Sequence, residues 1–223
     1  MKTKVIAIDG PAGSGKSTTA KLVAKKLGFL YLDTGAMYRT LTLKVLDEGI
    51  NPRSEDEVSK AAETSRIEIK QGNGVNRIFL DGRDVTEKIR DSRIDENVSF
   101  VSKYKRVRET LVNLQRKIGE NQNVVAEGRD TTTVVFPQAF IKIYLDCDLK
   151  ERAKRKALEF QGKGITTSIN EQKEKLALRD RIDSKRELSP LKKDKDAFII
   201  DTTHLNIEQQ VDKVVQIYNE SIS

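Results

Sequence analysis

The feature that most constrains this chain is a glycine-rich stretch near its start. It fits the pattern G-x-x-x-x-G-K-[ST] and is preceded by an apolar run at residues 5–8. A segment with apolar residues at helical spacing follows it. A strand, a loop and a helix in this order predict a phosphate-binding loop. The loop residues are Gly10, Pro11, Ala12, Gly13, Ser14, Gly15, Lys16, Ser17 and Thr18.

The residue types in this loop suit a phosphorylated ligand. Glycines let the backbone N–H groups approach an anion, and the helix that follows adds the positive end of its dipole. Lys16 is expected to reach the outer phosphates, and the Ser17 hydroxyl is expected to bind Mg2+. The alternative is a glycine-rich turn between a buried strand and a helix, which would require neither Lys16 nor Ser17.

The charge balance admits two kinds of partner. The 223 residues carry 41 Lys and Arg against 34 Asp and Glu, which gives a net charge of +7. Such a surplus fits either a nucleic-acid surface or a site that gathers several phosphates. Aromatic residues make up only 5% of the chain and tryptophan is absent, which disfavours stacking platforms for bases. Composition alone does not choose between the two. A site for several phosphates would explain the surplus without a nucleic-acid partner, and we expect none.

The sequence also predicts a cytoplasmic protein that does not enter a membrane. No apolar run approaches the roughly 20 residues that a membrane-spanning helix needs. Residues 1–4 lead directly into the first strand and leave no room for a signal peptide. The only cysteine, Cys147, cannot form an internal disulfide, so a reducing cytosol is the natural compartment.

A second short strand, at residues 29–32, is followed by a candidate ligand site. Asp33 and Thr34 are expected to cap the next helix. Tyr38 and Arg39 lie one turn inside that helix, so a hydroxyl, an aromatic ring and a guanidinium could converge on a second ligand. A capping role alone is the equally weighted alternative.

Apolar residues alternate on both sides of the glycine-rich stretch 71–74. They are Ile67 and Ile69 before it, and Ile78 and Leu80 after it. This pattern predicts an antiparallel hairpin, which would be a short insertion in an α/β domain.

A long helical segment is predicted to follow Ser92. Ser99 and Arg108 lie nine positions apart, which puts them half a turn out of phase on one straight helix. If both contact one ligand, the helix must break near residues 103–105. Two solvated polar positions are the favoured alternative.

A third buried strand, at residues 123–126, leads into Glu127, Gly128, Arg129 and Asp130. Ligands of open parallel sheets bind at the carboxyl ends of the strands. A carboxylate can accept from the amino group of cytosine while a guanidinium donates to its ring, so Arg129 and Asp130 could read that base. Glu127 is placed like an acid that orients Mg2+ through water.

Arg179, Asp183 and Arg186 share one face of a predicted helix. They could form ion pairs on a solvated surface, worth a few tenths of a kcal/mol. Alternatively, the helix is a lid that lays two arginines over phosphates. A glycine pair precedes this helix and a Ser-Pro sequence ends it, which favours the lid.

Four motifs together resemble those of the bacterial cytidylate kinases, of the nucleoside monophosphate kinase class. Besides the loop they are LDTGAMYR at 32–39, GRD at 128–130 followed by TVVFP, and RDRIDSKR at 179–186 followed by SPL at 189–191. The resemblance runs nearly end to end. It implies one P-loop kinase domain over residues 1–223, a three-layer α/β sandwich with a five-stranded parallel sheet. It also implies a small antiparallel insertion at 63–98 that binds the monophosphate, and a helical lid at 150–190.

The resemblance further implies a reaction and its residues. ATP would phosphorylate CMP and dCMP in pyrimidine nucleotide metabolism, with the loop binding ATP and Arg155 as a candidate for adenine. Mg2+ would be held by Ser17 and, through water, by Asp33 and Glu127. The expected catalytic residues are Lys16, Arg129, Arg179 and Arg186. The expected contacts to CMP are Thr34, Tyr38, Arg39, Ser99, Arg108, Arg129, Asp130, Arg179 and Asp183.

Two positions depart from the pattern of these kinases. Glu127 stands where members often have Asp, which lengthens the reach to a metal-bound water, and Thr131-Thr132 replaces a Met-Gly pair beside the base pocket. The alternatives are a kinase for UMP or AMP on the same scaffold, or a P-loop ATPase that binds nucleic acid. No Asn-Lys-x-Asp guanine motif is present. A monomer is expected.

Overall fold

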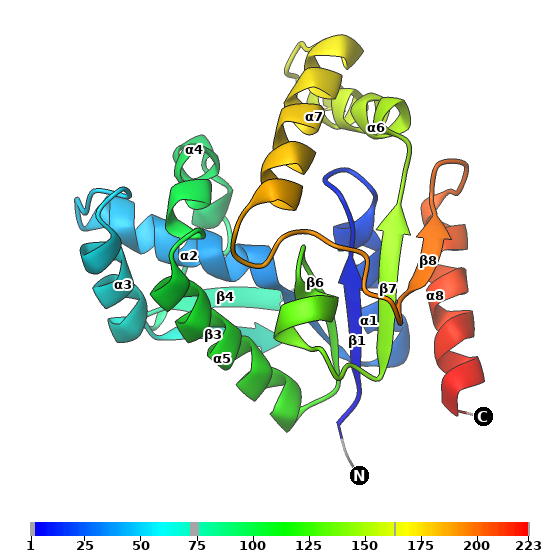
Figure 1. Ribbon diagram of the computed structural model, residues 1–223, viewed down its shortest axis with the longest axis horizontal. Helices are drawn as coiled ribbons and strands as arrows, with labels where there is room; N and C mark the ends of the chain where they lie inside the picture. Colours follow the sequence, from blue (N-terminus) through cyan, green and yellow to red (C-terminus); the bar gives the residue numbers. More distant parts are fainter. Residues whose placement is uncertain (1–2, 72–75, 163, 223) are drawn as a thin grey trace.

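The computed structural model describes residues 3–71, 76–162 and 164–222. They form a five-stranded parallel sheet and a three-stranded antiparallel sheet, with helices packed around both (Figure 1). The predicted α/β class and five-stranded parallel sheet are confirmed. Every helix in this described part of the chain is too short or too polar to cross a membrane.

The parallel sheet brings the predicted site segments to one edge. Its strand order is β2-β6-β1-β7-β8, so β1 lies in the middle. In the strand registers, Glu127 pairs with Ile8 on one side and with Asp33 on the other. The carboxyl ends of three strands therefore meet beside the loop that follows β1. The strands are β1 (Val5–Asp9), β2 (Leu30–Asp33), β6 (Val124–Glu127), β7 (Ile141–Asp146) and β8 (Phe198–Asp201).

Four helices cover the two faces of this sheet: α1 (Lys16–Leu27), α2 (Thr34–Asp47), α5 (Lys105–Asn121) and α8 (Ile207–Ile222). Ile6 and Ile8 pack in a core with α1 and α8, whereas Ala7 belongs to the core on the opposite face, with α2 and α5. Side chains alternate between the faces of a strand, so the apolar residues 5–8 of β1 can be buried on both faces. The result is three layers.

A smaller unit with the antiparallel sheet lies between α2 and α5. The predicted hairpin is confirmed as β3 paired with β4, while its turn at 72–74 lies outside the described residues. The helical segment expected after Ser92 is divided between Ser99 and Arg108, because α4 ends at Val101 and α5 begins at Lys105. This is the break that a shared ligand of Ser99 and Arg108 would require. The elements are α3 (Glu55–Thr64), β3 (Ile67–Gln71), β4 (Asn76–Leu80), β5 (Arg83–Asp84), η1 (Lys88–Arg90) and α4 (Ser92–Val101).

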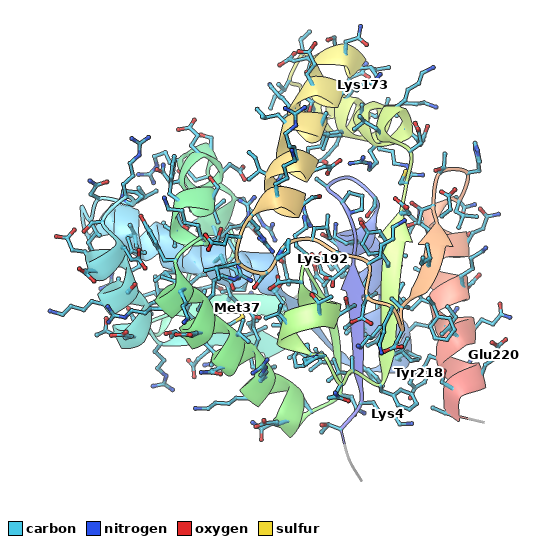
Figure 2. All side chains as sticks on the ribbon, viewed as in Figure 1. Lys4, Met37, Lys173, Lys192, Tyr218 and Glu220 are labelled. Carbon is cyan, nitrogen blue, oxygen red and sulfur yellow. The ribbon has the colours of Figure 1, made fainter. Side chains whose placement is uncertain are left out.

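Two helices, α6 (Leu149–Gly162) and α7 (Ile169–Lys185), pack against each other. Figure 1 shows them beyond the edge toward which β1 and β7 point. Lys173, labelled in Figure 2, lies near the end of α7 that is farthest from the sheet. The two helices are therefore placed over the loop that follows β1. The functional boundaries at 63–98 and 150–190 stay predictions.

Candidate active site

The glycine-rich loop leaves the first turn of α1 free to bind an anion. Gly13 and Gly15 have φ angles of 78° and 94°, in the left-handed region that glycine tolerates. A Cβ on Gly10 would lie 2.2 Å from the carbonyl oxygen of Leu145, so only glycine lets the loop pass this close to β7. Gly15 is the N-cap of α1, and no side chain caps this end. The first N–H groups of α1 are therefore available to a ligand.

Lys16 is folded over this loop. Its side chain is buried, and its Nζ donates to the carbonyl oxygen of Pro11 at 2.8 Å. Burial, followed by the positive charge of Arg129, lowers the pKa of Lys16 to about 7. Because Arg129 belongs to the segment after β6, this effect places two predicted catalytic cations close together.

Oxygen atoms gather where Mg2+ is predicted to bind. The Ser17 hydroxyl donates to Oε1 of Glu127 at 2.7 Å, and the Tyr31 hydroxyl donates to the same oxygen at 3.2 Å. Burial raises the pKa of Glu127, and the negative charge of Asp33 adds to this effect. Asp33 also caps α2, as predicted, by accepting from the N–H of Ala36 at 2.9 Å.

These groups fit a hard cation that keeps most of its water. Hydroxyl and carboxylate oxygens suit Mg2+, which binds through few protein ligands together with substrate phosphates. Within the described residues, no group of three or more His, Cys, Asp or Glu side chains could hold a metal by itself. A cation at this place would therefore need further oxygen ligands from water or from a bound phosphate.

A second charged cluster lies around Asp130. Arg108 donates to its Oδ2, and Arg186 donates from Nη2 to its Oδ1 at 3.4 Å. Arg108 also donates to the Ser189 hydroxyl at 3.1 Å and stacks over the Tyr38 ring at 5.3 Å. The hydroxyl of Tyr38 is buried without a hydrogen-bond partner. Three predicted contacts to CMP, on α2, on α5 and after β6, are thus brought together.

A third cluster joins the segment after β6 to α7. Arg129 donates from Nε to Oδ2 of Asp183 at 2.7 Å, and Nε of Arg179 lies 4.0 Å from the same oxygen. Although burial opposes it, the Asp183 carboxylate raises the pKa of Arg129. The structure therefore gives Arg129 and Asp130 different partners and does not join them as one base-reading pair.

Thr34, Arg39, Ser99 and Arg155 lie outside these clusters. Thr34 is buried and donates to the carbonyl oxygen of Glu127 at 2.8 Å, which ties α2 to β6. Arg39 pairs with Asp95 of α4. Ser99 is exposed on α4.

Arg155 lies on α6 but faces the segment after β8 instead of the loop. Its Nη2 donates to the carbonyl oxygen of Thr202 at 2.6 Å. In the structure it therefore connects α6 to the segment between β8 and α8, and its predicted contact with adenine stays a prediction.

Arg152, one turn earlier on α6, was not predicted and contacts the glycine-rich loop directly. It is buried, and its Nη1 donates to the carbonyl oxygen of Ala12 at 3.0 Å and to Oδ2 of Asp180 at 2.8 Å. It therefore links the loop to α7. The sequence offers only a run of basic residues on one helix, which does not tell Arg152 from its neighbours.

Comparison with known proteins decides the family. The family described as Cytidylate kinase matches residues 6–220. The chain belongs to the cytidylate kinase family. A cytidylate kinase of Bacillus cytotoxicus is 45% identical over 217 residues, covering 97% of this chain and 96% of the relative. One of Bacillus cereus is also 45% identical, over 212 residues that cover 95% of this chain and 94% of the relative.

Two solved structures share the fold at low identity. An uncharacterized protein from Eubacterium ventriosum has a TM-score of 0.55 at 13% identity, covering 97% of this chain and 99% of its own. TT1252 from Thermus thermophilus has a TM-score of 0.50 at 15% identity, covering 100% of both chains. The prediction of a phosphotransferase of the cytidylate kinase family is confirmed by the family match and the relatives.

Proposed function

We propose that the loop after β1 binds ATP with Mg2+, and that the residues around Asp130 and Asp183 bind CMP or dCMP. A phosphate oxygen of the monophosphate attacks the γ-phosphorus of ATP. The bond from that phosphorus to the β–γ bridging oxygen breaks, which yields CDP or dCDP and ADP. The observation that carries this proposal is geometric: Arg129 and Arg186 pair with Asp183 and Asp130. Glu127, two residues before Arg129, accepts from Ser17 beside Lys16. Cations from three segments therefore converge where phosphates would meet.

The converging cations suit the chemistry. The transition state of phosphoryl transfer is loose and highly charged, so catalysis consists mainly of alignment and charge stabilisation. Lys16 stabilises the transferred group, while Arg129, Arg179 and Arg186 neutralise oxygens of the donor and the acceptor. Burial, together with the positive charge of Arg108, lowers the pKa of Arg186, and the negative charge of a bound phosphate would raise it again. Closure of α6 and α7 would keep water away from the transferred group.

When bound, Mg2+ would neutralise negative charge on the phosphates of ATP. Ser17 would hold it directly, and Asp33 and Glu127 would hold it through water. The bonds from Ser17 and Tyr31 both go to Oε1 of Glu127. Glu has one methylene group more than the Asp expected at this position. The two hydrogen bonds hold the longer side chain of Glu127 in place.

Arg108 and Asp130 are the pair we propose to read cytosine. Asp130 accepts from the exocyclic amino group, and Arg108 donates to the ring nitrogen or the carbonyl oxygen of the base. Both side chains are buried, and they already contact each other in the ligand-free protein. Uracil has a carbonyl in place of the amino group. Its carbonyl oxygen would face the Asp130 carboxylate, and neither group could donate a hydrogen bond to the other. The remaining predicted contacts, Thr34, Tyr38, Arg39 and Ser99, are proposed to hold other parts of CMP.

A coupled assay of ADP release across CMP, dCMP, UMP, AMP and GMP tests the proposal. We expect CMP and dCMP to be preferred. Arg108→Met should raise the KM for CMP and weaken the preference over UMP while the KM for ATP stays the same. Arg106→Met is the matched control, since Arg106 lies exposed on the same helix and pairs with Glu63. A preference for AMP or GMP would contradict the proposed cytosine contacts.

We propose, as the sequence analysis expects, that a monomer is the active unit. Light scattering at the enzyme concentration of the activity assay would measure the molar mass and so test this directly. The cytoplasmic location stays a prediction.

A further inference from the structure

Asp9 makes an unusual set of contacts at the end of β1. It is fully buried and stands immediately before Gly10, the first residue of the phosphate-binding loop. Its Oδ1 accepts from the N–H of Thr131 at 2.9 Å. Its Oδ2 accepts from the N–H of Thr132 at 2.7 Å and from the Thr132 hydroxyl at 2.6 Å. One carboxylate thus receives three hydrogen bonds from a segment more than 120 residues away in the chain.

These donors belong to the first residues of η2 (Thr131–Val135), a single turn of π-helix. At its other end, Arg116 of α5 donates to the carbonyl oxygens of Val135 at 2.9 Å and Val134 at 2.6 Å. An anion therefore lies at the N-terminal N–H groups of the turn and a cation at its C-terminal carbonyls. Both signs are those that stabilise a helical turn.

The residue directly before η2 is Asp130, whose carboxylate pairs with Arg108 and Arg186. Fixing the backbones of Thr131 and Thr132 fixes the residue that precedes them. We propose that Asp9 is a positioning residue for the acceptor nucleotide, because it holds Asp130 at a set place relative to the phosphate-binding loop. This inference rests on the proposed role of Asp130 in reading the base.

The two threonines at 131 and 132 contribute differently to the contact with Asp9. The Thr132 hydroxyl donates to Asp9 in addition to the Thr132 backbone N–H. The Thr131 hydroxyl is buried without a partner, so its contribution lies in its backbone N–H alone.

An Asn at position 9 would break this arrangement with little change in shape. Its amide offers one acceptor oxygen, and its NH2 group would face an N–H donor of η2. A buried donor that loses its acceptor is costly, so the turn would shift to find another partner. Asp130 would move with it, while the loop on the other side of Asp9 keeps its glycines and its helix.

The test measures kcat and the KM values for CMP, UMP and ATP in Asp9→Asn, with CMP affinity measured by calorimetry without ATP. We expect the KM for CMP to rise by about tenfold, equivalent to about 1.4 kcal/mol, and the preference for CMP over UMP to fall. The KM for ATP should change far less. Asp84→Asn is the matched control, because Asp84 accepts from the N–H and hydroxyl of Thr86 in the same pattern on exposed β5.

A second pair of variants keeps the test decisive if Asp9→Asn does not fold. Thr132→Val removes only the hydroxyl donor and should raise the KM for CMP in the same direction, whereas Thr132→Ser should restore it. Equal changes in the KM values for ATP and CMP, or no change in folded variants, would overturn the positioning role. If the unmodified protein preferred a purine monophosphate, the proposed function would fail. The role of Asp9 would still be tested by comparing, in Asp9→Asn and the unmodified protein, the ratio of the KM for the preferred acceptor to the KM for ATP.

Discussion

Lys16 donates a hydrogen bond to the carbonyl oxygen of Pro11, five residues earlier in the same loop, at 2.8 Å. This bond holds Lys16 over the loop whose bound phosphates it is proposed to contact. The buried ammonium group lies beside the positive charge of Arg129, and both effects lower its pKa. Bound phosphate would supply the negative charge that this position lacks. Lys16 is therefore placed where an anion would favour its charged form.

Replacing Lys16 with Met should reduce turnover by about 100-fold or more, as expected on removal of one preorganised donor. The coupled assay with saturating ATP and CMP measures this loss. Lys25→Met is the matched control, because Lys25 is exposed on the same helix. Turnover near the unmodified level would contradict the catalytic role of Lys16.

The pKa of Lys16 also predicts how stability depends on pH. The folded-state pKa is about 7 and the reference value is 10.5, so the unfolded state binds more protons between these values. The contribution of Lys16 to the free energy of unfolding therefore rises with pH across this window. Urea unfolding at pH 7, 8 and 9 should show a steeper rise in the unmodified protein than in Lys16→Met. Parallel pH profiles would show that Lys16 holds its proton in the folded state.

Replacing Glu127 with Gln should raise the Mg2+ concentration needed for half-maximal activity by about 10–100-fold, a typical effect of losing a residue that orients metal ligands. The amide keeps an acceptor for Ser17 or Tyr31 but loses the charge. Burial already raises the pKa of Glu127, so the neutral variant should fold without loss of stability. Glu120→Gln, exposed on α5, is the control. An unchanged Mg2+ requirement would rule out a role toward the metal.

Replacing Gly128 with Ala should destabilise the protein by about 1–3 kcal/mol, the usual cost of overpacking. A Cβ there would lie 2.4 Å from the hydroxyl oxygens of both Thr34 and Thr131. Gly162→Ala is the control, because a Cβ there meets nothing within 4 Å. Thermal unfolding of the two variants gives the comparison, and equal losses would mean that Thr34 and Thr131 move aside freely.

The sequence predicted the elements well because their signals are local. Four apolar residues before the glycine-rich loop suffice to indicate a strand buried on both faces. The break between α4 and α5 was expected only on the condition that Ser99 and Arg108 contact one ligand, because nine positions put them half a turn out of phase on a straight helix. The strand, by contrast, required no knowledge of distant parts of the chain.

Partner choice could not be predicted in the same way. Asp130 pairs with Arg108 and Arg186, which lie 22 and 56 positions away on other elements. The sequence placed Arg129 beside Asp130, but the fold turns the two side chains to different partners. Arg152 and Arg155 are both arginines and lie one turn apart. Only the packing of α6 decides which of them reaches the loop.

The place of β1 in the sheet has a consequence for synthesis of the chain. Its two neighbours are β6 and β7, which begin at Val124 and Ile141. A nascent chain that has reached only α5 therefore carries a central strand with both edges open, and open apolar edges are where chains associate wrongly. The parallel sheet can therefore close around β1 only after β7 has been synthesised.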